Sequence, residues 1–370
     1  MSRTPVPLVD LRRQYAPLLP ALREAANAVL EACDFVGGKA ITRFEQAFAA
    51  TLGVTASVGV GNATGGLHAA LHSLGVGRGD EVIVPAHTAI ATAEAVTLTG
   101  AQVVFADIEP DTYTLDADDV ARRLTSRTRA IVPVHLYGQA ADLDRLMALA
   151  DTHALYLVED CAQAVGGRLH GRALGSFGDA GVFSFFPSKN LGGFGDGGAV
   201  IARDAELLKR IRMYSNHGRE DKYEHRFEGV NSRLDTLQAA LLSVNLPHLE
   251  TWNAARRRIA DHYRNRLGHL PWLTLPVERP GAVHVHHVYV VRSARRDALA
   301  AHLHERGVRT GLHYPVPLHR QPAYAHLGLG PGSLPVAEAV CDSCLSLPMF
   351  PGLTADEVDR VCDAVEAFDA

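Results

Sequence analysis

The chain has few lysines: only four of its 36 basic residues are Lys. It also has only five cysteines in 370 residues, too scattered for a disulfide scaffold. No apolar run is long enough to span a bilayer, and residues 1–5 lack the apolar core of a signal peptide. The formal charge of -5 gives no electrostatic footprint for nucleic acid or an anionic membrane. We therefore expect a cytoplasmic protein that binds neither.

A β/α alternation runs through the middle of the chain. Several of its short segments are apolar throughout, which is typical of strands covered on both faces. We expect strands at 57–60, 81–84, 102–105, 130–134, 155–159, 181–185 and 198–202, with helices between the first five at 64–74, 89–99, 116–124 and 141–152. This pattern predicts an α/β fold with a large, mostly parallel sheet and helices on both faces.

The regions that flank this alternation differ from it. We expect helices at 21–32 and 41–52, a long helical region over 231–266, a strand at 284–292, a helix at 296–306, a Pro-rich loop at 313–322 and a last helix near 354–368. A chain of 370 residues is long enough for two domains. We predict a large domain over residues 1–245 and a smaller C-terminal α+β domain over 246–370.

Lys189 lies between the aromatic segment Phe183–Phe186 and the glycine-rich segment Gly192–Gly198. Because most positions that need a surface cation use Arg, we do not expect this lysine to serve for charge alone. A lysine amine can lose a proton and attack a carbonyl, which Arg does not do. The setting favours a Schiff-base lysine, whose usual partner is pyridoxal phosphate (PLP). The alternative is a surface lysine in a glycine-rich turn.

Two segments offer candidate phosphate ligands, since ligands of open α/β sheets bind at the carboxyl ends of the strands. Ala63 and Thr64 open a helix directly after a strand, where free N–H groups and the Thr64 hydroxyl can bind a phosphate. An ordinary capped turn, with Asn62 or Thr64 as the cap, is the alternative. Ser184 lies at a strand end five residues before Lys189 and is a second candidate donor to the phosphate.

A further apolar strand ends in two acids, Glu159 and Asp160. PLP acts as an electron sink only while its ring nitrogen stays protonated, and a carboxylate such as that of Asp160 maintains this state. Gln163 follows three residues later and is placed to hold the phenolic oxygen of the cofactor or to pack above its ring. A helix N-cap is the alternative role for Asp160. A phosphate cradle, a carboxylate and an amine are together what PLP requires of a protein.

With these residues the chain resembles the DegT/DnrJ/EryC1/StrS family of sugar aminotransferases. The resemblance runs nearly end to end and is carried by Pro7–Leu11, Phe35–Gly38, Glu81–Pro85, Glu159–Ala164, Ser184–Lys189, Gly195–Gly198 and Gly229–Asp235. It implies the type I aminotransferase fold, a homodimer with two active sites at the interface, and PLP as cofactor. It implies a PLP Schiff base on Lys189, with Asp160 at the ring nitrogen and Gln163 near the ring oxygen.

The resemblance implies further site residues. Ser184, Ala63 and Thr64 would hold the phosphate, with Asn231 reaching it from the other subunit, while Arg233, His313 and Tyr314 would bind the sugar or line the nucleotide-sugar cleft. Family members often carry an aromatic residue, stacked on the cofactor, at the position that is Ala89 here. His87 lies two residues earlier and would stack instead if the backbone is extended. Another branch has His in place of the lysine and dehydrates sugars; Lys189 argues against it.

The resemblance also implies the reaction. The expected donor is L-glutamate and the expected acceptor a nucleotide-linked keto-sugar. Segments 231–238 and 313–318 look most like members that aminate at C3 of the sugar. A 4-keto-sugar aminotransferase and a non-catalytic regulatory protein that kept the fold are the alternatives.

Two motifs raise the question of a metal. His284 and His286 would share one face of a strand and could hold zinc, but no carboxylate or Cys lies at a helpful spacing. Cys341 and Cys344 form a C-x-x-C without a second pair, where a helix end is expected to run into a loop. We expect both motifs to be structural, and no metal site.

Overall fold

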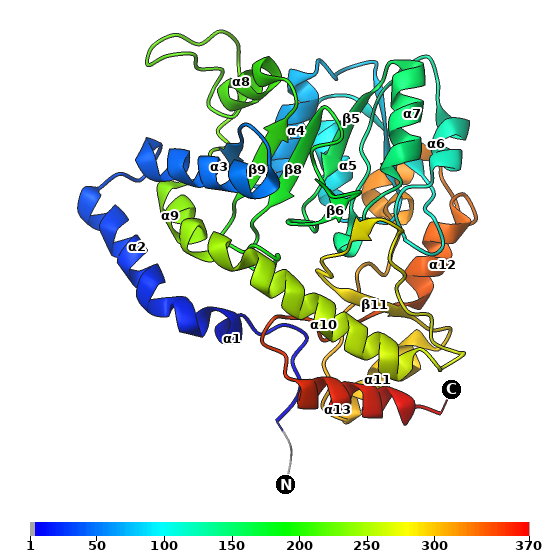
Figure 1. Ribbon diagram of the computed structural model, residues 1–370. Coiled ribbons are helices and arrows are strands. Elements are labelled where there is room, and N and C mark those ends of the chain that lie inside the picture. Colours follow the sequence, from blue (N-terminus) through cyan, green and yellow to red (C-terminus); the bar gives the residue numbers. More distant parts are fainter. Residues whose placement is uncertain (1–3, 370) are drawn as a thin grey trace.

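The computed structural model describes residues 4–369, and its centre is a seven-stranded sheet in the order β1-β9-β8-β5-β4-β2-β3 (Figure 1). The strands are β1 (Val58–Val60), β2 (Glu81–Pro85), β3 (Gln102–Ala106), β4 (Thr128–Ile131), β5 (Tyr156–Asp160), β8 (Ala180–Ser184) and β9 (Gly198–Ala202). Strand β9 is antiparallel to both of its neighbours, and the other neighbouring pairs are parallel. The predicted mostly parallel sheet is therefore confirmed.

Helices cover both faces of this sheet. Because side chains alternate along a strand, Val82 and Val158 face one hydrophobic core while Ile83 and Leu157 face another. The first core is completed by α4 (Ala63–Ser73), α5 (Ile90–Leu98) and α8 (Ala205–Tyr214), and the second by α3 (Gly38–Leu52), α6 (Ala117–Arg123), α7 (Leu143–His153) and α9 (Thr236–Asn245). The predicted helices agree with these within a few residues, whereas α8 was not predicted.

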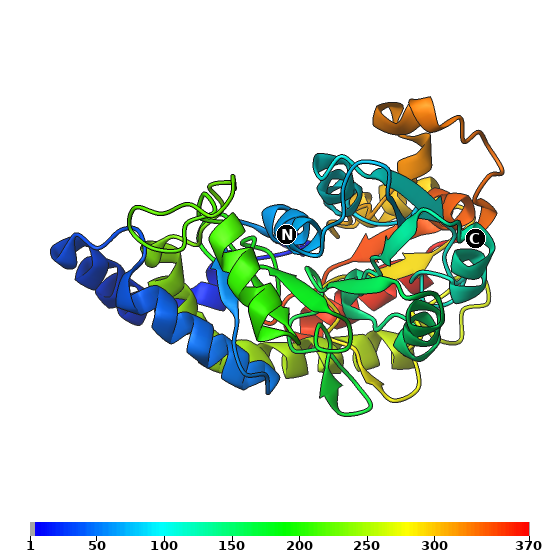
Figure 2. The ribbon, with the colours of Figure 1, turned by 90° about the horizontal axis from the view of Figure 1, so that it is seen from above.

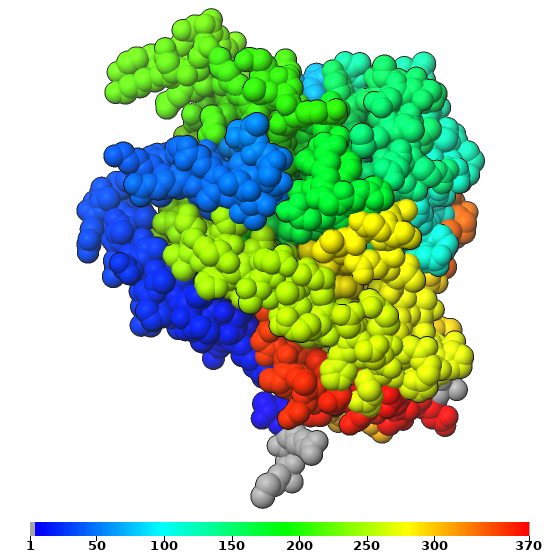
Figure 3. All heavy atoms as spheres, in the orientation of Figure 1, coloured from blue at the N-terminus to red at the C-terminus, as the bar shows by residue number. Residues whose placement is uncertain are grey.

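The C-terminal part of the chain builds a third core. Its elements are α10 (Leu249–Leu267), β11 (Tyr289–Arg292), α11 (Arg296–Glu305), α12 (Pro335–Ser343), β12 (Cys344–Leu347) and α13 (Ala355–Glu366), with β11 antiparallel to β12. Helix α10 enters this core with Ile259 and Tyr263, and Val6 joins it from the N-terminus. Figure 3 shows α10 crossing the face of the molecule between the blue N-terminal helices and the red C-terminal helix. The division into domains at residue 245 stays a prediction.

Shorter elements complete the structure. They are helices α1 (Leu11–Tyr15) and α2 (Leu19–Ala32), strands β6 (Arg168–Leu169), β7 (Arg172–Ala173) and β10 (Ala282–Val283), and 3-10 turns at Ala16–Leu18, Leu136–Gly138, Leu246–His248, Leu318–Arg320 and Pro322–Leu327. Seen from above, α2 and α3 extend to one side of the sheet, away from the orange C-terminal elements (Figure 2). Within residues 4–369, no helix is both long and apolar enough to cross a membrane.

Two expectations for the C-terminal part are wrong. The strand expected from residue 284 begins only at Tyr289, because His286 has a positive φ of 42° and breaks the extended backbone. The rings of His284 and His286 consequently stack at 3.8 Å between centroids, and both are buried. The loop expected after Cys341 and Cys344 is instead strand β12, whose pairing with β11 is not visible in a local sequence pattern.

Candidate active site

A cavity of about 680 Å³ lies at the carboxyl ends of β2, β5 and β8. Six of the predicted site residues line it: Ala63, Thr64, Asp160, Gln163, Ser184 and Lys189. They come from segments far apart in the sequence, and the parallel strands deliver them to the same edge of the sheet. The structure therefore gathers in one cleft the candidate amine, carboxylate and phosphate ligands.

Lys189 lies in a turn after β8, in which its N–H donates to the Phe186 carbonyl at 2.8 Å. The side chain is partly exposed to the cleft, yet enough protein surrounds the amine for desolvation to lower its pKa to about 8, against an opposing effect of the Asp160 charge. A typical lysine has a pKa near 10.4. A much larger fraction of the Lys189 amine is therefore uncharged and nucleophilic near neutral pH.

Asp160 ends β5 with only 4% of its surface exposed. Its Oδ1 accepts a hydrogen bond from the Ala162 N–H at 3.0 Å, and its Oδ2 accepts one from the Thr92 hydroxyl at 2.8 Å. Burial raises the pKa of Asp160, while these two bonds and the charge of Lys189 oppose the rise. Residues 161–167 form turns rather than a helix, so the alternative of a helix N-cap is wrong.

The first turn of α4 forms the candidate phosphate cradle. Asn62 is the N-cap, and its Oδ1 accepts from the Gly65 N–H at 2.8 Å. A Cβ on Gly65 would lie 2.4 Å from Ser232 Oγ, and one on Gly198 would lie 3.0 Å from the Ala63 nitrogen. Glycines at both positions thus let the backbone approach closely, and the N–H groups and dipole of the helix N-terminus favour an anion here.

Ser184 and Gln163 border this cradle in different ways. Ser184 Oγ accepts from the Phe186 N–H at 3.3 Å, so the hydroxyl proton remains available for a ligand. Gln163 accepts the Tyr137 N–H at 2.7 Å and donates through Nε2 to Tyr314 Oη at 3.2 Å. The amide of Gln163 therefore connects Tyr314 to the cleft. Cradle, carboxylate and amine together fit PLP.

His87 does not line the cleft, contrary to the expectation that it would stack on the cofactor. Strand β2 ends at Pro85, and the bend that follows turns the imidazole into the protein. Its Nε2 lies 2.6 Å from Tyr137 Oη and its Nδ1 lies 3.1 Å from Cys341 Sγ. Burial lowers the pKa of His87 to about 3, so the ring is neutral. The cleft wall is formed instead by Thr88 and Ala89.

Four other predicted residues lie outside the lining of the cleft: Asn231, Arg233, His313 and Tyr314. Asn231 is exposed and pairs through its backbone with Asn216, whose side chain accepts from Arg233 Nη1 at 2.9 Å. His313 Nδ1 lies 2.8 Å from Ser346 Oγ, and burial lowers its pKa, with the charge of Lys189 adding to the effect. Tyr137 donates to the His313 carbonyl, so the 313–314 segment is tied to the same interior network as His87.

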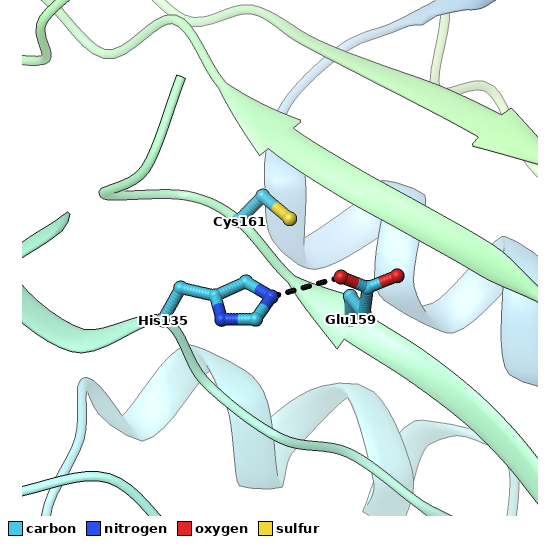
Figure 4. A group of neighbouring side chains, drawn as sticks. All are labelled: His135, Glu159 and Cys161. Carbon is cyan, nitrogen blue, oxygen red and sulfur yellow. Dashed lines mark hydrogen bonds and ion pairs between the residues drawn. The ribbon is translucent and has the colours of Figure 1, made fainter. Parts of the chain in front are cut away.

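His135, Glu159 and Cys161 form a second buried cluster (Figure 4). Glu159 Oε2 contacts His135 Nε2 at 2.9 Å and the Gly175 N–H at 2.7 Å. Glu159 Oε1 accepts the N–H groups of Phe177 and Gly178, both at 2.7 Å. The Ala141 N–H donates to His135 Nδ1, which places the ring proton on Nε2. Four donors thus occupy the carboxylate, and the cluster fastens the 175–178 turn.

Comparison with known proteins agrees with this geometry. Residues 20–366 match the DegT/DnrJ/EryC1/StrS aminotransferase family. The chain belongs to this family. It is 47% identical over 362 residues to the erythromycin biosynthesis sensory transduction protein EryC1 of Saccharopolyspora erythraea, covering 98% of this chain and 99% of the relative. It is also 47% identical over 365 residues to the dTDP-3-amino-3,4,6-trideoxy-alpha-D-glucose transaminase of Streptomyces venezuelae, covering 98% and 96%.

A solved structure of a family member extends the agreement to three dimensions. DesV of S. venezuelae, determined in complex with a ketimine intermediate, superposes with a TM-score of 0.96 at 46% identity over 98% of both chains. The predicted fold is therefore confirmed for this aminotransferase, and PLP is the cofactor of its family. Thr92 and Tyr137 were missed in the sequence because a helical Thr and a loop Tyr carry no local signal of contact with Asp160 or Gln163.

Proposed function

We propose that this family member transfers the amino group of L-glutamate to C3 of a nucleotide-linked keto-sugar. The observation that carries the proposal is the meeting of an amine of lowered pKa, Lys189, with a buried carboxylate, Asp160, in one cleft beside a helix N-terminus. The S. venezuelae relative, named for a 3-amino sugar, supports amination at C3. A 4-keto-sugar acceptor is the alternative.

Each residue of the cleft has a definite role in this proposal. The N–H groups of Ala63 and Thr64, with the Ser184 hydroxyl, bind the phosphate of PLP. Asp160 holds a proton at the ring nitrogen by presenting a negative charge in a buried site. Lys189 Nζ binds the cofactor and, once free, takes the proton from Cα of the amino donor. When bound, PLP supplies an electron sink that makes this Cα proton removable.

We infer that the protein is a homodimer in which the partner completes the cleft. Large apolar side chains are exposed at the surface, among them Leu30, Phe35, Val36, Phe186 and Phe194, with Val36 at 58% and Phe186 at 52%. A partner subunit would remove such apolar side chains from water, and Phe186 also borders the cleft. A partner that covers Phe186 would lie beside the cleft, and the exposed Asn231 of each subunit would then reach the cleft of the other.

The proposal is tested first by absorption spectroscopy of the purified protein with PLP. We expect a visible band from PLP bound to Lys189, which falls when L-glutamate is added and persists when D-glutamate is added. Without such a band, the role of Lys189 is wrong. If the band is present but does not change on addition of L-glutamate, L-glutamate is not the amino donor. A regulatory role of the kind named for EryC1 then becomes the better explanation. Incubating the glutamate-treated protein with 3-keto and 4-keto nucleotide sugars then distinguishes the acceptors.

A further inference from the structure

Asp160 is held by a short chain of hydroxyl groups that the function described so far does not use. Thr92 lies in the first turns of α5 and is 1% exposed. Its hydroxyl donates to Asp160 Oδ2 at 2.8 Å. The hydroxyl of Thr88, at the carboxyl end of β2, lies 3.3 Å from that of Thr92. Thr88, Thr92 and Asp160 therefore form a buried hydrogen-bonded chain that joins the ends of two strands through a helix.

Which group donates in each of these two hydrogen bonds follows from the chemistry of the side chains. A threonine hydroxyl has one proton and can also accept. Because the carboxylate of Asp160 only accepts, the proton of Thr92 points to Asp160. Thr88 must then donate to Thr92. Thr88 also lines the cleft, so the hydrogen-bonded chain begins at the cleft wall and ends on the buried carboxylate.

We propose that Thr92 is a positioning residue that keeps Asp160 ionised and aimed into the cleft, and that Thr88 in turn holds the Thr92 hydroxyl. The inference rests on the proposed role of Asp160 at the cofactor ring nitrogen. Oδ1 accepts from the Ala162 N–H and Oδ2 accepts from the Thr92 hydroxyl. Because both oxygens are hydrogen-bonded, the carboxylate cannot rotate freely. Each oxygen keeps one further lone pair for a ligand proton.

The charge on Asp160 depends on few other groups. Lys189 faces it from the turn after β8 and favours the ionised form, whereas His135, from the segment after β4, bonds through Nε2 to Glu159. Tyr314 faces it from the 313–314 segment, and its own pKa is raised, first by burial and also by the charge of Asp160. Burial opposes ionisation and is the largest influence on the pKa of Asp160. Because the hydrogen bond from Thr92 lowers the pKa of Asp160, its loss should move this pKa upward.

The variant that tests this inference is Thr92→Val, which keeps the shape of the side chain and removes the donor. Thr92→Ser restores the hydroxyl and serves as the rescue. Thr97→Val is the matched control, because Thr97 lies on the same helix, is exposed and bonds only to the Glu94 carbonyl. We expect single-turnover reaction with L-glutamate to slow by about 10- to 100-fold in Thr92→Val and to recover in Thr92→Ser.

A second measurement uses the protein without cofactor. Burial already raises the folded pKa of Asp160 above its unfolded value, so stability is lost as pH rises through the folded pKa. Thr92→Val should extend this loss to higher pH. We therefore expect the difference in melting temperature between Thr92→Val and the unmodified protein to grow as the pH rises through the folded pKa of Asp160.

The outcomes separate this inference from the proposed function. Two results together would show that Thr92 only contributes packing. The difference in melting temperature between Thr92→Val and the unmodified protein would be the same at every pH, and Thr92→Ser would not restore the single-turnover rate. Unchanged single-turnover rates in Thr92→Val would also overturn the inference. If the unmodified protein fails to bind PLP, the proposed function fails, while the pH dependence of the cofactor-free protein still decides whether Thr92 controls the charge on Asp160.

Discussion

Glu159 and Asp160 are neighbours at the end of β5, both buried, yet they have different surroundings. Side chains alternate along a strand, so Glu159 points away from the cleft and Asp160 into it. Glu159 accepts four hydrogen bonds, three of them from the 175–178 turn, whereas Asp160 accepts two and faces Lys189. A carboxylate with all its lone pairs engaged holds structure together. One with lone pairs left beside an amine is available for chemistry.

The largest expected effect on activity comes from removing the amine of Lys189, which faces Asp160. Lys189→Ala removes the group that binds the cofactor and moves the Cα proton, so we expect turnover to fall by about 10⁴-fold. PLP would still bind through phosphate contacts without the visible band. Steady-state assay and absorption spectra measure the two effects.

Lys209→Ala is the control for this variant. Lys209 lies on α8 with half of its side chain exposed and pairs with Glu220 at 3.5 Å, so its loss should leave turnover unchanged. Turnover near the normal rate in Lys189→Ala would contradict the assignment of the amine.

On the other side of the strand, Glu159→Ala should act on stability. It leaves His135 and three buried N–H groups without a partner, and losing one member of a buried pair costs about 3–5 kcal/mol. Urea unfolding of the cofactor-free protein measures this. Glu250→Ala, which breaks an exposed pair with Arg257, should cost less than about 1 kcal/mol. Equal losses in the two variants would remove the distinction between the buried and the exposed carboxylate.

Asp160→Asn should lower activity and leave stability nearly unchanged, the reverse of Glu159→Ala. The amide accepts and donates hydrogen bonds in the same place but carries no charge, so we expect single turnover with L-glutamate to slow by about 10- to 100-fold while the fold is retained. Rapid-mixing absorbance measures the rate, and urea unfolding checks the fold. Normal single-turnover rates would show that the charge at this position is dispensable.

The same substitution should move the titration of Lys189. The amine has a pKa of about 8 because burial lowers it and the charge of Asp160 raises it. The free amine, which attacks the PLP aldehyde, is therefore fully present only above this pKa. We expect the rate at which PLP attaches to the protein to rise as pH increases through about 8, and this rise to occur at lower pH in Asp160→Asn. A profile identical in both proteins would mean that the two groups do not interact.

The contrast between Glu159 and Asp160 also shows which features of the site can be predicted from the sequence and which cannot. The strands of the large sheet were predictable because buried parallel strands are apolar throughout, and six site residues were found because they lie at strand ends or within a few residues after them. What separates Glu159 from Asp160 was not predictable, since it depends on N–H groups of the 175–178 turn and on Thr92 from α5. His87 was misplaced for the same reason: the bend after Pro85 ends the alternation on which the expectation relied.

The smallest effect is expected from metal removal. His135, Glu159 and Cys161 have the residue types of a zinc site, and their candidate ligand atoms lie within 4.8 Å of one another. The ring proton of His135 occupies Nε2, however, and both oxygens of Glu159 already accept two donors each. An ion would have to displace bonds that fasten the 175–178 turn. We therefore expect dialysis against a chelator, or addition of zinc, to leave the melting temperature and the visible band unchanged. A melting temperature that falls on chelation and returns with zinc would reassign Glu159 from a structural carboxylate to a metal ligand.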